Sequence, residues 1–510
     1  MLFSIFLILG GLPGGPSPSG IGADVQAYRF SIVLSDSTNR IQGLAGIRVR
    51  FTENETSFRL DLEKTMTVSA VTEGSRPVRY AQDASGVTLR VHADANSVHT
   101  YAVTYVGIPR DGLIISSNKF GHRTFFGDNW PDRAHCWLPC VDHPWNKAPV
   151  EFLVTAPARY QVVAGGRKTE ERDLPGGMHF THWVEKVPLP TKVMVIGVAD
   201  FAIQRLPDVG GIPLYTYVFP ENKERGFHDY ALAARILPFY IRNIGPYAYE
   251  KLANVQSKTI FGGMENASAI FYYEGSVGSP GLERLMAHEI AHQWFGDAVT
   301  EGSYAHLWLS EGFATYMTHL YMEHAYGADS LKAGLRLDRN RIIAFTRYSS
   351  RPVVDIHRVG GYMALLDTNS YQKGSWVLHM LRREVGDSLF WRGIRMYFAR
   401  YDGRNAHTQS FRRVMEEVSG INLETFFHQW IYSPGIPLLR LSIAGHMLKV
   451  EQAQSQPFSF PLEYTIGDDP RVFRVRIHRK ITLIPLPPQT TGQIHADPGV
   501  NLLADIRVNP

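Results

Sequence analysis

The stretch MAHEIAHQW, residues 286–294, decides how the rest of this chain is interpreted. Apolar residues around it recur at helical spacing, and this pattern predicts a helix. Residues four apart lie on one face of a helix, one turn from each other. His288 and His292 can therefore direct two imidazoles at one metal ion. Glu289 then places a carboxylate beside that ion, where a general base acting on metal-bound water would stand.

A bare His-Glu-x-x-His pattern is a moderate signal, because a surface helix can carry two histidines without binding a metal. Leu285, Trp294 and Phe295 flank this one and indicate a buried helix. Buried imidazoles need polar partners, and a metal ion supplies them. The flanking residues therefore favour the metal over the surface helix.

A catalytic zinc usually takes three protein ligands and leaves one position for water. The segment LWLSEGFA, residues 307–314, offers Glu311 as the third ligand. A lone glutamate in an apolar stretch is costly to bury unless it has a partner. This setting favours a ligand over the alternative, a surface glutamate.

Length and composition indicate an ordinary globular protein of several domains. The 510 residues exceed what one hydrophobic core serves, and we expect two to four domains. Hydrophobic residues make up 44% and charged residues 20%, which excludes disordered and collagen-like classes. The net charge of +4 gives no basic footprint, so we expect no nucleic-acid partner. Composition makes no prediction about self-association, which stays open.

The apolar run MLFSIFLILGGL, residues 1–12, is too short to span a bilayer. With the small residues that follow, it predicts a signal peptide over residues 1–23, although the run has no Lys or Arg before it. We therefore expect an exported protein, periplasmic or secreted, and a cytoplasmic one if this segment is not a signal peptide. No other segment has the length and apolarity of a membrane helix.

The chain changes character twice, which predicts a multidomain α+β protein. Residues 24–204 alternate with period two and predict an antiparallel β domain. Residues 205–437 are mainly helical and hold the candidate site. Residues 438–510 return to strands and predict a small, β-sandwich-like C-terminal domain. Predicted strands include 28–32, 46–51, 87–91, 100–105, 438–443 and 473–478, and predicted helices cover 227–244, 282–295, 307–326, 376–385 and 410–418.

Two further features have alternative interpretations. Cys136 and Cys140 stand beside His135 and His143, but their spacing matches no standard zinc pattern, so we expect a packed loop. The cysteines could be bridged or reduced. Strand 473–478 has one basic face, which could bind an anion, but a solvated strand face is the more ordinary interpretation.

With these residues the chain resembles the gluzincins, and more narrowly the aminopeptidase N family. Eighteen residues separate His292 from Glu311, as in that pattern. Three further segments match in order: GGMEN at 262–266 resembles the family's exopeptidase motif, YQKG at 371–374 the segment with its catalytic tyrosine, and FFHQW at 426–430 the end of its catalytic domain. LPCVD at 138–142 extends the resemblance into the β domain.

The resemblance implies a thermolysin-like catalytic domain and a zinc-dependent aminopeptidase with one catalytic Zn²⁺. His288, His292 and Glu311 would bind the metal, and a zinc-bound water activated by Glu289 would attack the first peptide bond. Tyr371 would donate a hydrogen bond to the developing oxyanion. Glu265 would bind the free α-ammonium of a peptide substrate. The substrate-binding segment around it would consist of Gly262, Gly263, Met264 and Asn266.

This sequence departs from the family pattern at three places. Ser310 stands where Asn commonly precedes the third ligand, and Thr318 stands where an acidic residue often follows it. Both positions concern the shell that orients ligands, so they bear on rate. The third departure is length, because many relatives carry a long helical C-terminal domain and this sequence ends at Pro510. We expect a more open cleft, or one that a partner chain covers.

Three rival functions agree less well with this sequence. An endopeptidase has no N-terminal ammonium to bind, and Glu265 argues against it. A non-enzymatic binding module would be expected to lose ligands or base, and all of them are present here. A bifunctional epoxide hydrolase is known in one branch of the family, but nothing in this sequence indicates a lipid substrate.

Overall fold

The computed structural model describes residues 22–356, 361–487 and 492–509. These residues form two compact units. Unit 1 extends to Ser303 and includes Phe398–Ala406, whereas unit 2 comprises Tyr304–Tyr397 and the chain from His407 onward. The division falls inside the predicted range 205–437. The predicted signal peptide lies outside the described residues except for Gly22 and Ala23, and Ala23 is the first residue of strand β1.

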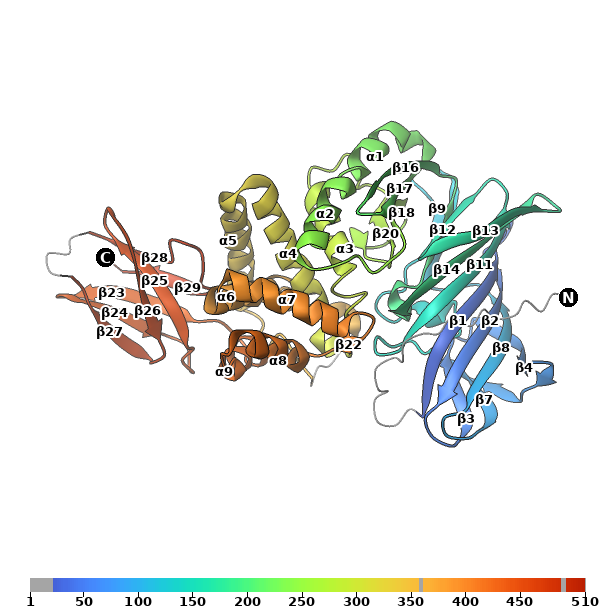
Figure 1. The fold of residues 1–510 in the computed structure, drawn as a ribbon, viewed down its shortest axis with the longest axis horizontal. Coiled ribbons are helices and arrows are strands. Elements are labelled where there is room, and N and C mark those ends of the chain that lie inside the picture. The colour runs from blue at the N-terminus through green and yellow to red at the C-terminus, as the bar shows by residue number, and fades with distance from the viewer. Residues whose placement is uncertain (1–21, 357–360, 488–491, 510) are drawn as a thin grey trace. The chain divides into compact units, whose positions relative to one another are not determined.

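The N-terminal part of unit 1 is a β domain, as the period-two alternation predicted (Figure 1). Its largest sheet has eight strands in the order β13-β14-β11-β1-β2-β8-β4-β5. A four-stranded sheet, β12-β15-β10-β9, and a three-stranded sheet, β3-β7-β6, accompany it. The bounds in chain order are β1 Ala23–Val33, β2 Ile41–Phe51, β3 Glu55–Asp61, β4 Met66–Glu73, β5 Arg76–Pro77, β6 Tyr80–Gln82, β7 Gly86–Ala93, β8 Val98–Gly107, β9 Leu113–Ser117, β10 Arg123–Gly127, β11 Lys147–Pro157, β12 Gln161–Ala164, β13 Arg167–Leu174, β14 Met178–Pro190 and β15 Ile196–Ala199.

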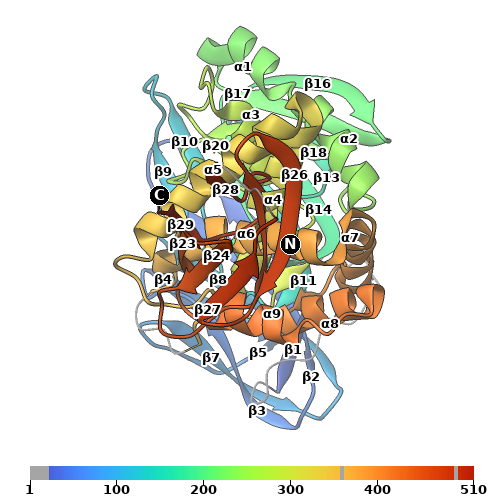
Figure 2. The ribbon, with the colours of Figure 1, turned by 90° about the vertical axis from the view of Figure 1, so that its left-hand side faces the viewer.

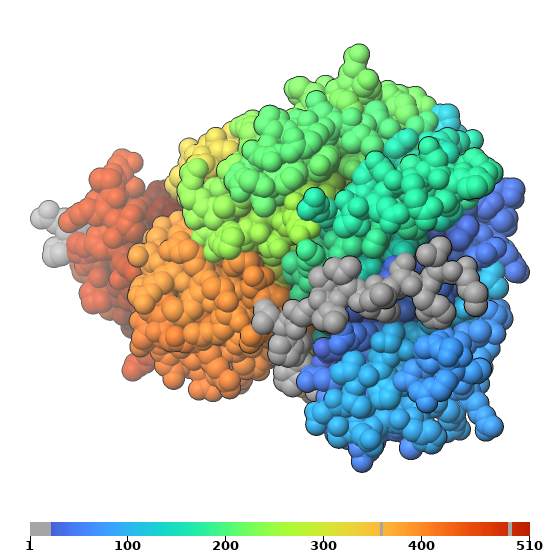
Figure 3. Space-filling model, turned by 45° about the vertical axis from the view of Figure 1, so that its right-hand side comes forward, coloured from blue at the N-terminus to red at the C-terminus, as the bar shows by residue number. Residues whose placement is uncertain are grey.

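Most neighbours in the large sheet are antiparallel, but β1 and β11 pair in parallel, with Tyr28 opposite Val150. The antiparallel prediction missed this pair, because alternation shows which face is buried but not the direction of the neighbour. Strand β13 forms one edge of this sheet and is exposed at nearly every position. The hairpin of β13 and β14 (teal) lies on the surface of this unit (Figure 3).

The rest of unit 1 contains the segment 286–294 and a mixed sheet. Five strands pair in the order β16-β17-β18-β20-β19, with β17, β18 and β20 parallel. The mainly helical prediction for residues 205–437 missed these strands. Of them, β18 and β20 are short and almost fully buried, and such runs show no alternation. The elements are β16 Ala202–Val209, β17 Ile212–Val218, α1 Lys223–Tyr230, α2 Ala233–Asn243, β18 Leu252–Ser257, β19 Gly263–Met264, β20 Ala269–Tyr273, α3 Leu282–His292, and the short pair β21 Thr300–Glu301 and β22 Asn405–Ala406.

Unit 2 combines helices with a small C-terminal β region (Figure 2). The helices are α4 Trp308–Tyr326, α5 Ala328–Phe345, α6 Gly374–Val385, α8 Thr408–Ser419 and α9 Glu424–Phe427, with π-helical turns at Asn369–Lys373 and His428–Tyr432; α7, Asp387–Tyr401, ends beyond the unit boundary. Two sheets follow, β27-β24-β23-β29 and β26-β25-β28. Their strands are β23 Leu438–Ala444, β24 Met447–Gln452, β25 Phe460–Ile466, β26 Asp469–Ile477, β27 Ile481–Pro485, β28 Ile494–Ala496 and β29 Asp505–Val508.

Within the described ranges, no helix has the length and apolarity needed to cross a membrane.

Candidate metal centre and substrate-binding residues

Helix α3 presents His288 and His292 one turn apart, as the spacing predicted. Their Nε2 atoms lie 3.0 Å from each other, and the two rings meet edge to face. Nitrogen ligands bind zinc at about 2.0–2.1 Å, so one ion can reach both atoms at this separation. His292 is buried, while His288 is partly exposed.

The orientation of His292 is fixed by a second bond on the other side of its ring. Its Nδ1 lies 3.0 Å from the Phe295 carbonyl oxygen. Because a carbonyl only accepts, Nδ1 is the protonated nitrogen, and Nε2 directs its lone pair toward His288. Metal-binding histidines are oriented by such a bond, so this donor set fits a zinc ion.

Glu289 lies against the glycine loop, Gly262 and Gly263, as well as near His292. Strand β19 pairs with β20, with Gly263 opposite Tyr272. A Cβ atom on Gly263 would lie 2.4 Å from Glu289 Oε1, whereas the nearest atom to a Cβ on Gly262 is Leu285 Cδ1 at 3.9 Å. The two glycines therefore differ: Gly263 makes room for the Glu289 carboxylate, and Gly262 faces open space.

Glu265 completes a buried group with Glu289 and His292. Ligand atoms of these three residues lie within 4.8 Å of one another, and Glu265 is only 5% exposed. Among the described residues its Oε1 has no hydrogen-bond partner, and neither has the side-chain amide of the buried Asn266. Met264 packs in the core. A buried carboxylate oxygen without a partner is unfavourable, so this geometry is suited to a cationic ligand.

Buried charges surround this group in unit 1. Lys192 Nζ lies 2.6 Å from Glu301 Oε1, and both side chains are almost fully buried. Burial lowers the pKa of Lys147 to about 7. Burial, reinforced by repulsion from Glu265, raises the pKa of Asp297 well above its usual range. These groups show that Glu265 lies in a poorly solvated environment, where charge interactions are strong.

Glu311 belongs to unit 2, on helix α4, and is 4% exposed. The burial predicted from its apolar neighbours is confirmed. The next residue, Gly312, packs against α6 so closely that a Cβ there would lie 3.0 Å from the Gly374 backbone and 3.1 Å from Ser370 O. Two facing glycines thus bring the backbone that carries Glu311 against the turn that carries Tyr371.

Tyr371 lies in the π-helical turn Asn369–Lys373 of unit 2 and is partly exposed. Asp367 organises this turn, because its Oδ1 accepts hydrogen bonds from the Asn369 and Ser370 amides. Arg351 binds the other oxygen of Asp367 at 2.9 Å. Tyr371 also lines an open hollow with Phe345 and Tyr348. Single π-turns inside helices are frequent at functional sites.

The two departures near Glu311 are both buried. Thr318 donates a hydrogen bond from Oγ1 to Ala314 O, 2.8 Å away in the same helix. The hydroxyl of this threonine therefore has its hydrogen-bond acceptor within α4. Ser310 is fully buried beside Glu311.

The structure thus places the predicted residues in two sets. Unit 1 brings together His288, His292, Glu289, Glu265 and Gly263, and unit 2 holds Glu311 and Tyr371 on packed neighbouring elements. Sequence reasoning missed the buried polar residues that support the first set, which are Gln293, Asp297, Lys147, Lys192, Glu301 and Lys251. One signal was available for Gln293, a polar residue between a metal ligand and the apolar pair Trp294-Phe295.

The cysteine segment is a packed loop. Cys136 and Cys140 are both free and buried. Burial raises the pKa of the Cys136 thiol to about 12 and that of Cys140 well above its usual range. His135 instead bonds through Nδ1 to Asp142 Oδ2 at 2.8 Å. No group of metal-binding side chains in the described chain includes either cysteine.

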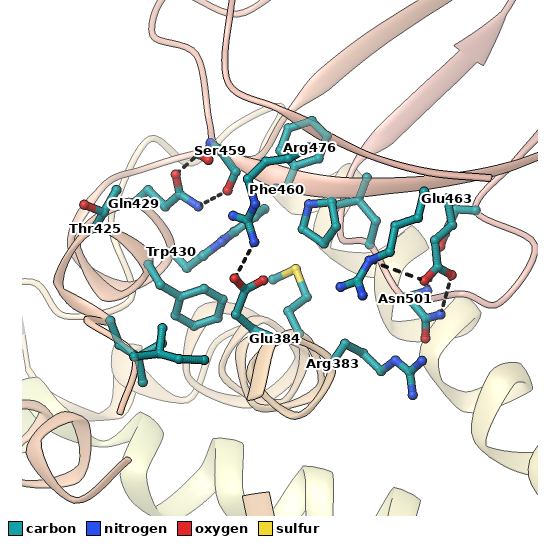
Figure 4. Close-up of a pocket in the computed structure, with 18 of the residues that line it drawn as sticks. Arg383, Glu384, Thr425, Gln429, Trp430, Ser459, Phe460, Glu463, Arg476 and Asn501 are labelled. Atoms are coloured by element: carbon teal, nitrogen blue, oxygen red, sulfur yellow. Dashed lines mark hydrogen bonds and ion pairs between the residues drawn. The ribbon is translucent and has the colours of Figure 1, made fainter. Parts of the chain in front are cut away.

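The basic face of strand β26 borders a cavity of about 140 Å³ in unit 2 (Figure 4). Arg476 pairs with Glu384 of α6, and Arg474 lies 4.0 Å from Glu463. Both arginine side chains are about half exposed. Because each guanidinium has a carboxylate nearby, the arrangement favours the solvated strand face over an anion site.

Two family models match the chain. Residues 25–193 match the peptidase M1 N-terminal domain, and residues 229–430 match the peptidase family M1 domain. The chain belongs to peptidase family M1. This confirms the resemblance to the aminopeptidase N family, and the second match contains the histidine pair of α3, Glu265, Glu311 and Tyr371.

Curated relatives of this M1 chain are aminopeptidases by name. Aminopeptidase M1-B of Oryza sativa subsp. japonica is 30% identical over 346 residues, which cover 63% of this chain and 38% of the relative. Leucyl aminopeptidase of Saccharolobus solfataricus is 24% identical, covering 84% and 56%. Probable aminopeptidase 1 of Sulfurisphaera tokodaii is 23% identical, covering 90% and 59%. The chain therefore spans less than two thirds of the length of these relatives.

Proposed function

We propose that this M1 chain is a zinc-dependent aminopeptidase that hydrolyses the N-terminal residue from peptides. The observation that carries the proposal is the buried Glu265 carboxylate, whose Oε1 has no hydrogen-bond partner among the described residues. It lies within 4.8 Å of ligand atoms of Glu289 and His292. The α-ammonium of a peptide would pair with this oxygen and hold the first peptide bond beside the metal ligands.

Zinc is proposed on His288, His292 and Glu311. The facing Nε2 atoms of the histidines support the first two ligands, and burial of an acidic side chain on α4 supports the third. Two imidazoles and one carboxylate are a donor set that zinc enzymes use for hydrolysis. When bound, the ion would polarise the scissile carbonyl and lower the pKa of a water molecule.

Glu289 is proposed as the general base. Its carboxylate is held beside Gly263, next to the segment that would bind the substrate. It would accept a proton from the attacking water and pass it to the leaving amine. Tyr371 would donate a hydrogen bond from its hydroxyl to the oxygen that develops negative charge. The bond network of Asp367 around its turn supports a fixed position for this hydroxyl.

Peptides with a free N-terminus are the proposed substrates. An endopeptidase would gain nothing from this buried carboxylate, because an internal peptide bond has no ammonium to pair with it, and a binding module would not need Glu289. Export is proposed from the signal-peptide pattern of residues 1–23 alone.

Glu265→Gln tests the role of the carboxylate, since it keeps size and burial and removes the charge. We expect kcat/KM for free aminoacyl amides to fall on the order of 100-fold or more, because the buried ammonium loses its counter-ion. Glu283→Gln, which neutralises a partly exposed glutamate of α3, is the matched control and should retain activity. Equal activity of the two variants would contradict the proposal.

A further inference from the structure

Gln293 directly follows the second histidine of α3 and is 1% exposed. Its side-chain amide uses both ends. Nε2 donates to Glu265 O at 2.8 Å and to Asp297 Oδ2 at 2.9 Å. Oε1 accepts from the Ser268 amide at 2.7 Å. The Tyr247 hydroxyl lies 3.3 Å from the same oxygen, but its one hydrogen also faces Lys251 O at 3.0 Å. Both N–H groups of the amide and one lone pair of its oxygen therefore have short hydrogen bonds.

The partners of Gln293 include both ends of the turn that follows Glu265. It binds the carbonyl of Glu265 itself and the amide of Ser268, three residues later. Because Gln293 is next to His292, these bonds connect the turn to the end of the metal-binding helix with no intervening flexible segment. This side chain thus helps to set the separation between the Glu265 carboxylate and the histidines.

The turn needs such support, because Ser268 has a φ of +60°. A non-glycine residue in the left-handed region is strained by about 1–3 kcal/mol and persists only when its surroundings hold it. Here Lys251 Nζ donates to Ser268 O at 3.1 Å, and the Gly166 amide donates to Ser268 Oγ at 2.7 Å. The Gln293 bond to the Ser268 amide is the one contact of this set that comes from the residue directly after α3.

The orientation of the Gln293 amide is determined by its partners. A backbone N–H can only donate, so the atom facing Ser268 is the oxygen, and the carbonyl of Glu265 requires the nitrogen. Asp297 in turn is held by its own amide, which donates to His292 O at 3.1 Å. An amide is therefore required at this position, since neither a carboxylate nor an apolar side chain could make both sets of bonds.

We propose that Gln293 is a positioning residue that sets the distance between the ammonium-binding carboxylate of Glu265 and the histidine pair. This inference rests on the proposed function. A fixed separation would select substrates with a single α-amino acid between the ammonium and the scissile bond. Gln293 would thus restrict cleavage to the first residue, although it touches neither substrate nor metal.

The alternative is that Gln293 only stabilises the core. Loss of stability alone would lower the amount of folded protein and would reduce binding of all ligands equally. Loss of positioning would change the discrimination between ligands with and without an α-amino group. The two roles therefore differ in the ratio of affinities for ligands with and without an α-amino group, and not in total activity.

The test compares Gln293→Met with Gln256→Met in the zinc-loaded full chain. Gln256 is a matched control, because it is equally buried and donates to Glu274 O while accepting from the Phe219 amide, away from Glu265. Calorimetry measures binding of leucinamide and of 4-methylpentanamide, which lacks only the amino group. Kinetics compares α-alanyl and β-alanyl fluorogenic amides.

We expect the preference for leucinamide over 4-methylpentanamide to fall about tenfold or more in Gln293→Met, since displacement of about 1 Å in an anchored site has large effects. The preference for α-alanyl over β-alanyl amides should fall as well. Gln256→Met should keep both ratios. Unchanged ratios in Gln293→Met would overturn the inference while leaving the aminopeptidase proposal intact.

The wild type separates the two proposals. If it shows no preference for leucinamide, the role of Glu265 fails, and the inference about Gln293 fails with it. If Gln293→Met does not fold, the double variant Gln293→Glu with Asp297→Asn replaces it. In this variant one carboxylate oxygen of Glu at position 293 still accepts from the Ser268 amide, and the other accepts from the side-chain amide introduced at position 297. The bond to Glu265 O is lost, because a carboxylate cannot donate. We expect its leucinamide preference to be reduced, and wild-type ratios in it would overturn the inference.

Discussion

The two units hold their parts of the proposed site by different physical means. In unit 1, hydrogen bonds and buried charges position Glu265 and the histidine pair, with Gln293 as the central bridge. In unit 2, close packing of Gly312 against Gly374 positions the backbone of Glu311 and Tyr371. The polar contacts of unit 1 depend on the hydrogen-bonding groups of each side chain. The glycine contact of unit 2 depends on the lack of a side chain at both positions. The two parts should therefore fail in different ways when mutated.

The largest effect is expected for Glu289→Gln in unit 1, which removes the base but keeps the shape of the side chain. We expect kcat to fall by about 10²–10⁴-fold, the usual contribution of a general base. Bound zinc, measured by elemental analysis, should remain, because Glu289 is not a proposed ligand. Unchanged turnover would exclude Glu289 as the base.

The glycine loop of unit 1 gives a sharper comparison. Gly263→Ala would place Cβ 2.4 Å from Glu289 Oε1 and displace that carboxylate, whereas Gly262→Ala meets no atom closer than 3.9 Å. We expect kcat to fall at least tenfold more in Gly263→Ala than in Gly262→Ala, because displacing a reacting group by about 1 Å is costly. Thermal unfolding should change little in either variant. Equal kcat values would show that Glu289 does not depend on Gly263.

In unit 2 the corresponding variant should act through stability. Gly312→Val overfills the contact with Gly374 and Ser370, and such overpacking costs about 1–3 kcal/mol of unfolding free energy. Gly361→Val is the matched control, since no atom of the described residues lies within 4 Å of its Cβ position. Denaturant unfolding measures both. If Gly312→Val were as stable as the control, the packing account of unit 2 would be wrong.

The smallest effect concerns acid stability of unit 2. Burial lowers the pKa of His379 to about 3. Below about pH 6.5 this histidine is protonated in the unfolded chain but stays neutral in the folded chain. Its contribution to the free energy of unfolding is therefore fully present above pH 6.5 and decreases as the pH falls toward 3. The slope is at most about 1.4 kcal/mol per pH unit. His379→Gln should flatten the pH dependence of unfolding between pH 6.5 and 4, compared with His324→Gln at an exposed position. An unchanged slope would contradict this.

Sequence patterns predicted those features that local spacing determines. The histidine pair follows from helical periodicity, and the N-terminal and C-terminal strands follow from alternation. The parallel pairing of β1 with β11 and the buried strands β17, β18 and β20 were missed, because partner and direction depend on residues distant in the chain. For the same reason, Gln293 could be noted as an unusual polar residue, but its partners could not be known.

The central claim is removal of N-terminal residues with the aid of a metal. The most direct test is a panel of aminoacyl fluorogenic amides, each with a free and an N-acetylated amino group, with and without a zinc chelator. We predict hydrolysis of the free amides, near-complete loss on acetylation because Glu265 then meets no cation, and loss with the chelator that added zinc reverses. Equal hydrolysis of free and acetylated substrates, or activity that resists the chelator, would contradict the account.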